Sequence, residues 1–161
     1  MSDWIMRSAE PRDADGLAQC VTAAYQLYVS RMGGQPPGPM LTDYAEEIAQ
    51  HQVWVAEANG EIIGGLVLIP YEDHILLDNI AVHPAYQGQG VGRTLLELAD
   101  AEAMLQGYGE LRLYTHVTMT ENIALYTRLG WIETHRGEQD GYARVFMRKP
   151  LPVQEGNAGS Q

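Results

Sequence analysis

Residues 83–96 read HPAYQGQGVGRTLL and contain three glycines at alternate positions, Gly88, Gly90 and Gly92. A strand-like apolar run, ILLDNIAV (75–82), comes directly before this stretch. The last residues of the stretch 83–96 begin a run typical of a helix. Glycines between a strand and a helix let backbone N–H groups approach a phosphate, and the helix N-terminus adds partial positive charge. The stretch therefore predicts a phosphate-binding loop.

Two nucleotide-binding loops do not fit this spacing. The P-loop requires a glycine, four residues and then Gly-Lys-Ser/Thr, whereas Gly88 is followed by QGVGRT without a lysine. The dinucleotide fingerprint requires glycines at relative positions 1, 3 and 6, and the sixth position counted from Gly88 is Arg93. That fingerprint also opens a parallel strand–helix–strand unit, whereas three successive strands are expected before this loop.

A third pattern fits. The sequence Q-x-x-G-x-G at 87–92, preceded by I-A-V-x-P at 80–84 and followed by an amphipathic helix, closely resembles motif A of the GNAT superfamily of acetyl-CoA-dependent N-acetyltransferases. NIALYTRLGW (122–131) is similar to motif B of the same family. The resemblance extends from about residue 4 to residue 149 and includes the order of the elements, so it implies that the chain binds acetyl-CoA.

The resemblance assigns the coenzyme to two stretches. In the family the loop wraps the coenzyme A pyrophosphate with main-chain N–H groups, which implies contacts at Gln87, Gly88, Gln89, Gly90, Val91, Gly92, Arg93 and Thr94. The preceding strand would offer main-chain groups to the amide-rich pantetheine arm at Ile80, Ala81 and Val82. The alternative is a turn without a ligand, but three ordered glycines cost roughly 0.5–1 kcal/mol each and a bare turn needs only one.

The resemblance also implies a proton donor. Acetyl transfer to an amine requires a proton for the departing thiolate, and the family uses a tyrosine at the position of Tyr126. Asn122 and Tyr126 are four residues apart on the expected helix and share one face, which differs from the Leu125 and Leu129 face that is expected to pack on the sheet. A phenol loses its proton only near pH 10 and can protonate a thiolate as it forms. The alternative for Tyr126 is packing against the coenzyme.

Two residues are candidates for the base that deprotonates the amine. Asp78 stands in an otherwise apolar strand, where a carboxylate is costly unless it is paired or functional. His116 lies on the next expected strand and has an intrinsic pKa suited to accepting a proton from an ammonium. For both residues a purely structural role remains the alternative.

The acceptor site is expected on the other side of the thioester, lined by the first two helices and the loop GGQPPGP (33–39). The candidate substrate-binding residues are Tyr28, Arg31, Met40 and Tyr44. Arg31 would suit a substrate carboxylate, or it is a solvated charge at the end of a helix. The family resemblance does not name the amine.

The elements predict an α/β (α+β) fold with a mixed, mostly antiparallel twisted sheet of about seven strands and helices on both faces, in the order β-α-α-β-β-β-α-β-α-β-β. Asn59-Gly60 predicts a hairpin turn, Thr42 a helix cap, and Thr118 with Glu121 a capping box. Strands are expected at 4–9, 53–58, 61–70, 74–82, 110–118, 131–136 and 142–149, and helices at 11–33, 41–51, 90–106 and 118–130. We expect one domain over residues 1–150 and a mobile tail at 151–161.

Composition limits the partners. The chain has 161 residues and a net charge of −11, which argues against nucleic acid or an anionic membrane as partner. No apolar run approaches a membrane span, and a lone cysteine, Cys20, together with the missing signal-peptide pattern, predicts a reducing cytoplasm. The five histidines have no metal-ligand spacing, so no metal is expected.

These observations favour an enzyme that moves acetyl from acetyl-CoA to a primary amine of a small molecule or peptide, by direct attack in a ternary complex. No catalytic-cysteine pattern favours a covalent route. The alternative is a non-catalytic module that senses acyl-CoA or serves a larger assembly. The Asn122/Tyr126 pair favours the enzyme, because a binding module has no need of the tyrosine. The resemblance is compatible with a homodimer.

Overall fold

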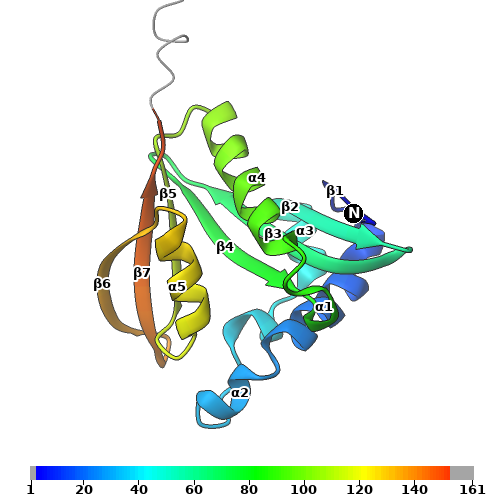
Figure 1. The fold of residues 1–161 in the computed structure, drawn as a ribbon, viewed down its shortest axis with the longest axis horizontal. Helices are drawn as coiled ribbons and strands as arrows, with labels where there is room; N and C mark the ends of the chain where they lie inside the picture. Colours follow the sequence, from blue (N-terminus) through cyan, green and yellow to red (C-terminus); the bar gives the residue numbers. More distant parts are fainter. Residues whose placement is uncertain (1–2, 153–161) are drawn as a thin grey trace, which may run out of the picture. The chain divides into compact units, whose positions relative to one another are not determined.

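The structure is a computed structural model that describes residues 3–152 (Figure 1). The order of its elements and their seven-stranded sheet confirm the predicted fold class. In chain order the elements are β1 (Trp4–Ser8), η1 (Pro11–Asp13), α1 (Ala14–Tyr25), α2 (Tyr28–Arg31), η2 (Gly38–Leu41), α3 (Tyr44–Gln50), β2 (Gln52–Ala58), β3 (Glu61–Pro70), β4 (Ile75–Val82), η3 (Pro84–Tyr86), α4 (Val91–Leu105), β5 (Glu110–His116), α5 (Thr120–Arg128), β6 (Ile132–Gln139) and β7 (Tyr142–Pro150).

The sheet has the strand order β1-β2-β3-β4-β5-β7-β6. The pairs β1–β2, β2–β3, β5–β7 and β6–β7 are antiparallel, and β4–β5 is parallel. The parallel ladder is short, because β4 meets β5 only at Ile75–Leu111 and Leu76–Arg112. Residues 77–82, the rest of the described strand, therefore do not pair with β5.

The chain forms two compact units. The N-terminal unit runs to Ile69 and includes Asp78–Glu97, and the C-terminal unit consists of Pro70–Leu77 and the described residues from Leu98 onward. Of the tail predicted at 151–161, the residues from 153 onward lie outside the described part of the chain. The single domain predicted over 1–150 stays a prediction.

Two adjacent glycines let helices pack on both faces of β3 in the N-terminal unit. A Cβ at Gly64 would lie 3.1 Å from the Val91 side chain of α4, whereas a Cβ at Gly65 would overlap the Leu17 side chain of α1. Successive strand residues point to opposite faces, so α4 and α1 cover opposite faces of β3. Leu17 and Val91 are both almost fully buried, which fixes the start of α4 against the sheet.

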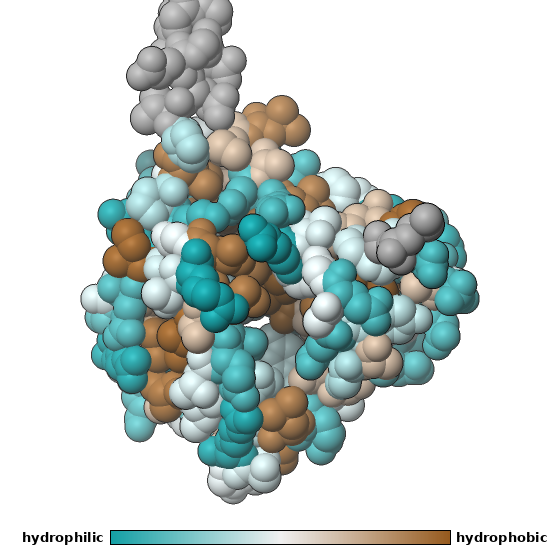
Figure 2. Space-filling model, viewed as in Figure 1, coloured by the Kyte–Doolittle hydropathy of each residue, from teal (hydrophilic) through white to brown (hydrophobic). Residues whose placement is uncertain are grey.

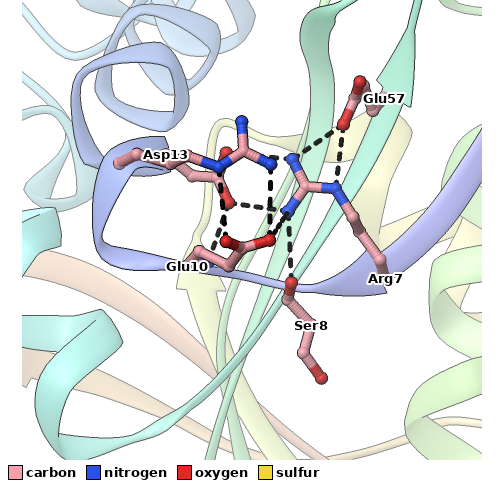
Figure 3. A network of polar contacts seen from close by, with 6 residues as sticks. Arg7, Ser8, Glu10, Asp13 and Glu57 are labelled. Atoms are coloured by element: carbon pink, nitrogen blue, oxygen red, sulfur yellow. Dashed lines mark hydrogen bonds and ion pairs between the residues drawn. The ribbon is translucent and has the colours of Figure 1, made fainter.

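An ion-pair network fixes the entry of the chain into α1 (Figure 3). Arg7 on β1 lies between Glu57 of β2 on one side and Asp13 and Glu10 on the other. Its Nη1 donates to Asp13 Oδ2 at 2.7 Å and its Nη2 to Asp13 Oδ1 at 2.9 Å, a bidentate contact with a carboxylate that is only 5% exposed. Arg7 thus connects two strands to the turn η1 before α1.

In the C-terminal unit one face of β5 and β7 is buried and the other carries polar and aromatic residues. Lys149 on the buried face reaches Asp100 of α4 at 2.5 Å and approaches Gly130 at the end of α5. The alternate residues Tyr142, Arg144, Phe146 and Arg148 lie on the opposite face of β7. The helices α4 and α5 therefore cover one face of this unit's strands.

Several predicted helix boundaries are wrong. The helix expected at 11–33 is divided into η1, α1 and α2. Asp43 rather than Thr42 caps α3, because its carboxylate accepts the N–H groups of Ala45 and Glu46. The N-cap of α5 is Met119 rather than Thr118, whose side chain lies 2.9 Å from His116 Nδ1, and α5 begins at Thr120.

The hairpin turn at Asn59-Gly60 is confirmed, with φ of 52° and 78° at its two residues. Such positive φ values at both positions match the twist of the two strands they join. Asp140-Gly141, between β6 and β7, has φ of 56° and 81° and makes a turn of the same kind. These two turns fix the register of the hairpins they close.

Hydrophilic residues cover much of the face shown in Figure 2, and hydrophobic residues form groups between them. Among the described residues no helix is long and apolar enough to cross a membrane, and no cluster of His, Cys, Asp and Glu could hold a metal ion.

Candidate functional site

The predicted phosphate loop lies between η3 and α4 in the N-terminal unit. Gly88 and Gly90 have φ of +81° and +88°, the left-handed region that favours glycine. A Cβ placed at either residue would have no heavy atom within 4 Å, so the loop backbone is open on that side. Gly92 differs, since its Cβ would lie 3.5 Å from Val82. Two of the three glycines therefore present an exposed, left-handed backbone.

The helix that follows adds unpaired donors. The first intrahelical bond of α4 runs from the N–H of Thr94 to the carbonyl of Gly90, at 3.0 Å. The N–H groups of residues 91–93 precede it and have no intrahelical carbonyl to bind. At the start of a 15-residue helix these donors carry partial positive charge. The open loop and the helix N-terminus together fit a pyrophosphate.

Arg93 and Thr94 differ in how strongly they are already bonded within the protein. Arg93 Nε lies 3.5 Å from Glu97 Oε2, and both side chains are exposed, so this pair is weak and Arg93 is available to a phosphate. Thr94 Oγ1 donates to the carbonyl of Gly90 at 2.9 Å. A hydrogen bond from Thr94 to a phosphate would therefore have to replace this contact.

The end of β4 is held by two tyrosines from the helical layer. Tyr25 Oη donates to the Ile80 carbonyl at 2.8 Å, and Asn79 Nδ2 donates to Tyr44 Oη at 2.6 Å. Tyr44 Oη donates in turn to the carbonyl of Pro39 at 2.7 Å. Asn79 is 7% exposed and Tyr44 4%, so the network is buried. It fixes the strand on which the pantetheine contacts are predicted.

Two residues of α3, Glu47 and Tyr44, interact electrostatically with the predicted base Asp78. Burial and then the charge of Asp78 raise the pKa of Glu47 on α3. Burial is also the main cause that raises the pKa of Tyr44, to which the charge of Asp78 adds. A carboxylate with a raised pKa binds a proton more strongly and is a better base near neutral pH. Asp78 is half-buried, on the less buried face of an alternating strand.

Some of the predicted acceptor residues are linked to one another through side-chain contacts. The Tyr28 ring lies 6.0 Å from that of Tyr25, and Arg31 Cζ lies 5.1 Å from the Tyr28 ring centroid. Tyr44 joins this set through Asn79, to which Tyr25 also donates a long hydrogen bond of 3.4 Å. Met40 is half-buried on η2, one residue after the Pro39 carbonyl that Tyr44 binds. All four residues belong to the N-terminal unit, and Tyr44 is bonded to Asn79 near the end of β4.

The predicted proton donor lies in the C-terminal unit. Tyr126 is 6% exposed, and its ring lies 6.0 Å from that of Trp131. It is the buried residue of α5, whereas Leu125 and Leu129, expected to pack on the sheet, are only half-buried. Asn122, one turn before Tyr126, is also half-buried and shares its helix face.

His116 has surroundings that weaken it as a base. Burial and the neighbouring Arg144 lower its pKa. The N–H of Thr118 donates to its Nδ1 at 3.2 Å, which assigns the proton of the neutral ring to Nε2. The free lone pair of the neutral ring is therefore already used within the chain.

The structure adds residues that the sequence argument did not single out. Tyr25 belonged to an apolar helical stripe, and nothing in its spacing indicated a hydrogen bond to β4. The burial of Asn79 could have been predicted, because strand alternation places it on the face opposite Asp78. The position of Glu47 next to Tyr44 could also have been predicted, since it lies three residues after Tyr44 on the same helix.

This combination of sheet, open glycine loop and helix defines an acetyltransferase domain. The family model described as "Acetyltransferase (GNAT) domain" matches residues 49–133, more than half of the chain. The chain therefore belongs to the GNAT acetyltransferase family.

Relatives and solved structures agree with this assignment. The mycothiol acetyltransferase of Jonesia denitrificans is 40% identical over 88 residues, which are 53% of this chain and 28% of that protein, so the match spans less than a third of the relative. The ribosomal-protein-S18-alanine N-acetyltransferase of Escherichia coli superposes with a TM-score of 0.74 at 25% identity, covering 93% of this chain and 95% of that one. The PaiA N-acetyltransferase of Thermoplasma acidophilum, solved with coenzyme A, shares the fold with a TM-score of 0.77 at 20% identity, over 94% of this chain and 100% of that chain.

Proposed function

We propose that this protein is an acetyl-CoA-dependent N-acetyltransferase that acts on a primary amine of a small molecule or peptide. The observation that carries the proposal is the pair of left-handed, sterically open glycines, Gly88 and Gly90, directly before a long helix. A bare turn does not need two such residues. A relative named mycothiol acetyltransferase and a solved structure named ribosomal-protein-S18-alanine N-acetyltransferase support an acceptor that is a small molecule or a peptide.

The loop residues 87–94 would hold the pyrophosphate through their N–H groups, with Arg93 as the added cation. Ile80, Ala81 and Val82 would offer main-chain groups to the pantetheine arm. The Ile80 carbonyl already accepts the Tyr25 hydroxyl, but a carbonyl has a second lone pair for a ligand amide. When bound, acetyl-CoA supplies a thioester carbonyl that an amine nitrogen can attack.

The roles of the side chains follow from their surroundings. Tyr126 would donate the proton that the thiolate needs, with Asn122 beside it on the helix. Asp78 and Glu47 would take the proton from the ammonium, because their mutual repulsion and burial favour protonation of one of them. His116 is the weaker candidate base, because its pKa is lowered and its Nδ1 is occupied.

The decisive first experiment compares thermal stabilisation by acetyl-CoA, NAD and ATP. A ligand that binds only the folded state raises its stability, by about 2.7 kcal/mol at a concentration of 100 Kd. We expect a rise in Tm with acetyl-CoA alone. Stabilisation by NAD or ATP without acetyl-CoA would contradict the assignment of the loop.

The second experiment follows release of the free thiol over a panel of amines and peptides. Turnover with any member supports the enzyme and identifies the class of acceptor. Stabilisation by acetyl-CoA together with no turnover over a broad panel would favour the alternative, a coenzyme-binding sensor or partner module.

A further inference from the structure

Arg144 on β7 has an unusual environment for a cation. Its Cζ lies 4.3 Å from the ring centroid of Tyr114 and 4.9 Å from that of Tyr142, both within cation–π distance. Its Nε is shielded from solvent and has no hydrogen-bond partner within the described residues. A buried donor left unsatisfied is costly, so an acceptor bound at the guanidinium would stabilise this arrangement further.

The neighbouring cations of the same unit are bound differently. Arg148, on the same face of β7, reaches Glu110 at 3.2 Å, and Arg112 reaches the other oxygen of Glu110. Arg136 on β6 pairs with Glu133. Arg144 lies opposite His116 in the ladder, and no carboxylate of residues 3–152 forms an ion pair with it.

The groups around Arg144 do not supply the missing negative charge. His116 contacts the edge of the Tyr142 ring, with the ring centroids 6.4 Å apart, and its Nδ1 is held by Thr118. Burial, and in addition the charge of Arg144, lowers the pKa of His116 and so favours the neutral form of its ring. Among the described residues, the Arg144 guanidinium is therefore stabilised by aromatic rings and not by a carboxylate.

We propose that Arg144, together with Tyr114 and Tyr142, binds a carboxylate group of the acceptor. The guanidinium presents a planar fork of N–H donors that matches a carboxylate, and the rings hold it in one orientation. The acceptor would then be an amino acid, or a peptide carrying a carboxylate, rather than a purely cationic amine. The identity of the ligand as the acceptor rests on the proposed function, whereas carboxylate binding at Arg144 does not.

The kinetic test compares each amino acid with its primary amide, for example L-lysine with L-lysinamide. We expect the wild-type kcat/KM to be higher for the acid, and Arg144→Gln to reduce this acid-over-amide preference roughly ten- to a hundredfold. Arg148→Gln is the matched control, since it removes a cation from the same face of the same strand and should leave the preference within about twofold. No preference in the wild type, or an equal loss in both variants, would overturn the proposal.

A binding test works without turnover. In the ¹⁵N-labelled protein, titration with acetate should raise the pKa of His116, because a carboxylate beside Arg144 offsets the positive charge that now lowers it. Methylamine is the carboxylate-free control and should not shift it. If acetate leaves the His116 pKa unchanged, the site is refuted even if the enzyme acetylates amines. If acetate raises it while no amine is acetylated, the site stands and the proposed function fails.

A phosphate of the coenzyme has related chemistry and is tested separately. If Arg144→Gln weakens binding of coenzyme A but not of 3′-dephospho-coenzyme A, the site belongs to the coenzyme and the proposal is wrong. Circular dichroism checks that the variant is folded. If Arg144→Gln is not folded, Arg144→Lys is used in its place. This substitution keeps the positive charge without the planar fork and should lose the acid-over-amide preference in part.

Discussion

Replacing Arg7 by methionine removes the centre of the network in Figure 3 while retaining a long apolar side chain. Arg7 is the residue that binds both oxygens of Asp13 and also reaches Glu57 at 2.7 Å. Without Arg7, the Asp13 carboxylate, 5% exposed, keeps only the N–H of Glu10, at 2.7 Å. The variant thus leaves a buried negative charge without its cation.

The size of the effect follows from this burial. Removing one partner of a buried ion pair costs about 3–5 kcal/mol. Arg7 is itself 20% exposed and Asp13 retains one hydrogen bond, so we expect a loss of about 2–3 kcal/mol. In a chain of this size that corresponds to a fall in Tm of roughly 5–10 °C.

The loss should depend on pH in a defined direction. The hydrogen bond from Arg7 is the largest cause that holds the pKa of Asp13 below its ordinary 3.8. A depressed carboxyl pKa stabilises the fold above the unfolded pKa, and this stabilisation is lost as pH falls through the folded value. The difference between wild type and variant should therefore be full at pH 7 and shrink below about pH 4.

Urea unfolding followed by circular dichroism, at pH 7 and at pH 3, measures both quantities. The matched control is Arg12→Met, because Arg12 is 68% exposed and its contact with Glu10 is a surface pair. It should cost less than about 0.5 kcal/mol. A cost below about 1 kcal/mol for Arg7→Met, or a cost equal at both pH values, would refute the reasoning.

Three further predictions concern the proposed site and the lone cysteine. Tyr126→Phe should lower kcat about 10²-fold or more with little change in coenzyme affinity, and unchanged turnover would remove Tyr126 as the proton donor. Gly90→Ala should weaken coenzyme A binding measured by calorimetry, because φ of +88° strains alanine and the added Cβ faces the open side of the loop. Gly107→Ala has the same φ at the far end of α4 and should leave that binding unchanged; equal effects of the two substitutions would contradict a ligand at the loop. Burial raises the pKa of Cys20 to about 12, so the native thiol should react with a disulfide reagent only on unfolding, and rapid labelling of the folded protein would disprove this.

The fold could be predicted from the sequence because its signals are local. The alternation in the strands, the Asn59-Gly60 turn and the glycine loop each depend on residues within a few positions of one another. Helix boundaries were less accurate, because Thr42 and Asp43 both favour a cap and the choice depends on which oxygen reaches two N–H groups.

The site was only partly predictable for a different reason. Spacing indicates that Asn122 and Tyr126 share a face, but it carries no information about the hydrogen bond from Tyr25 to Ile80, which joins residues 55 positions apart. Likewise, Arg148 reaches Glu110 whereas Arg144 lies opposite His116 and over two tyrosine rings, a difference that depends on the register between strands. Such contacts depend on tertiary packing, which a single sequence does not reveal.

The internal pairing of the basic residues has a consequence for kinetics. The chain carries a net charge of −11, and many of its basic residues are in ion pairs: Arg7, Arg12, Arg93, Arg112, Arg136, Arg148 and Lys149. The net charge therefore repels a polyanion such as acetyl-CoA at low ionic strength, and salt screens this repulsion, with a Debye length of about 10 Å at 0.1 M. The association rate constant of acetyl-CoA should rise as salt is added, the reverse of the behaviour of enzymes that steer anions with a basic surface.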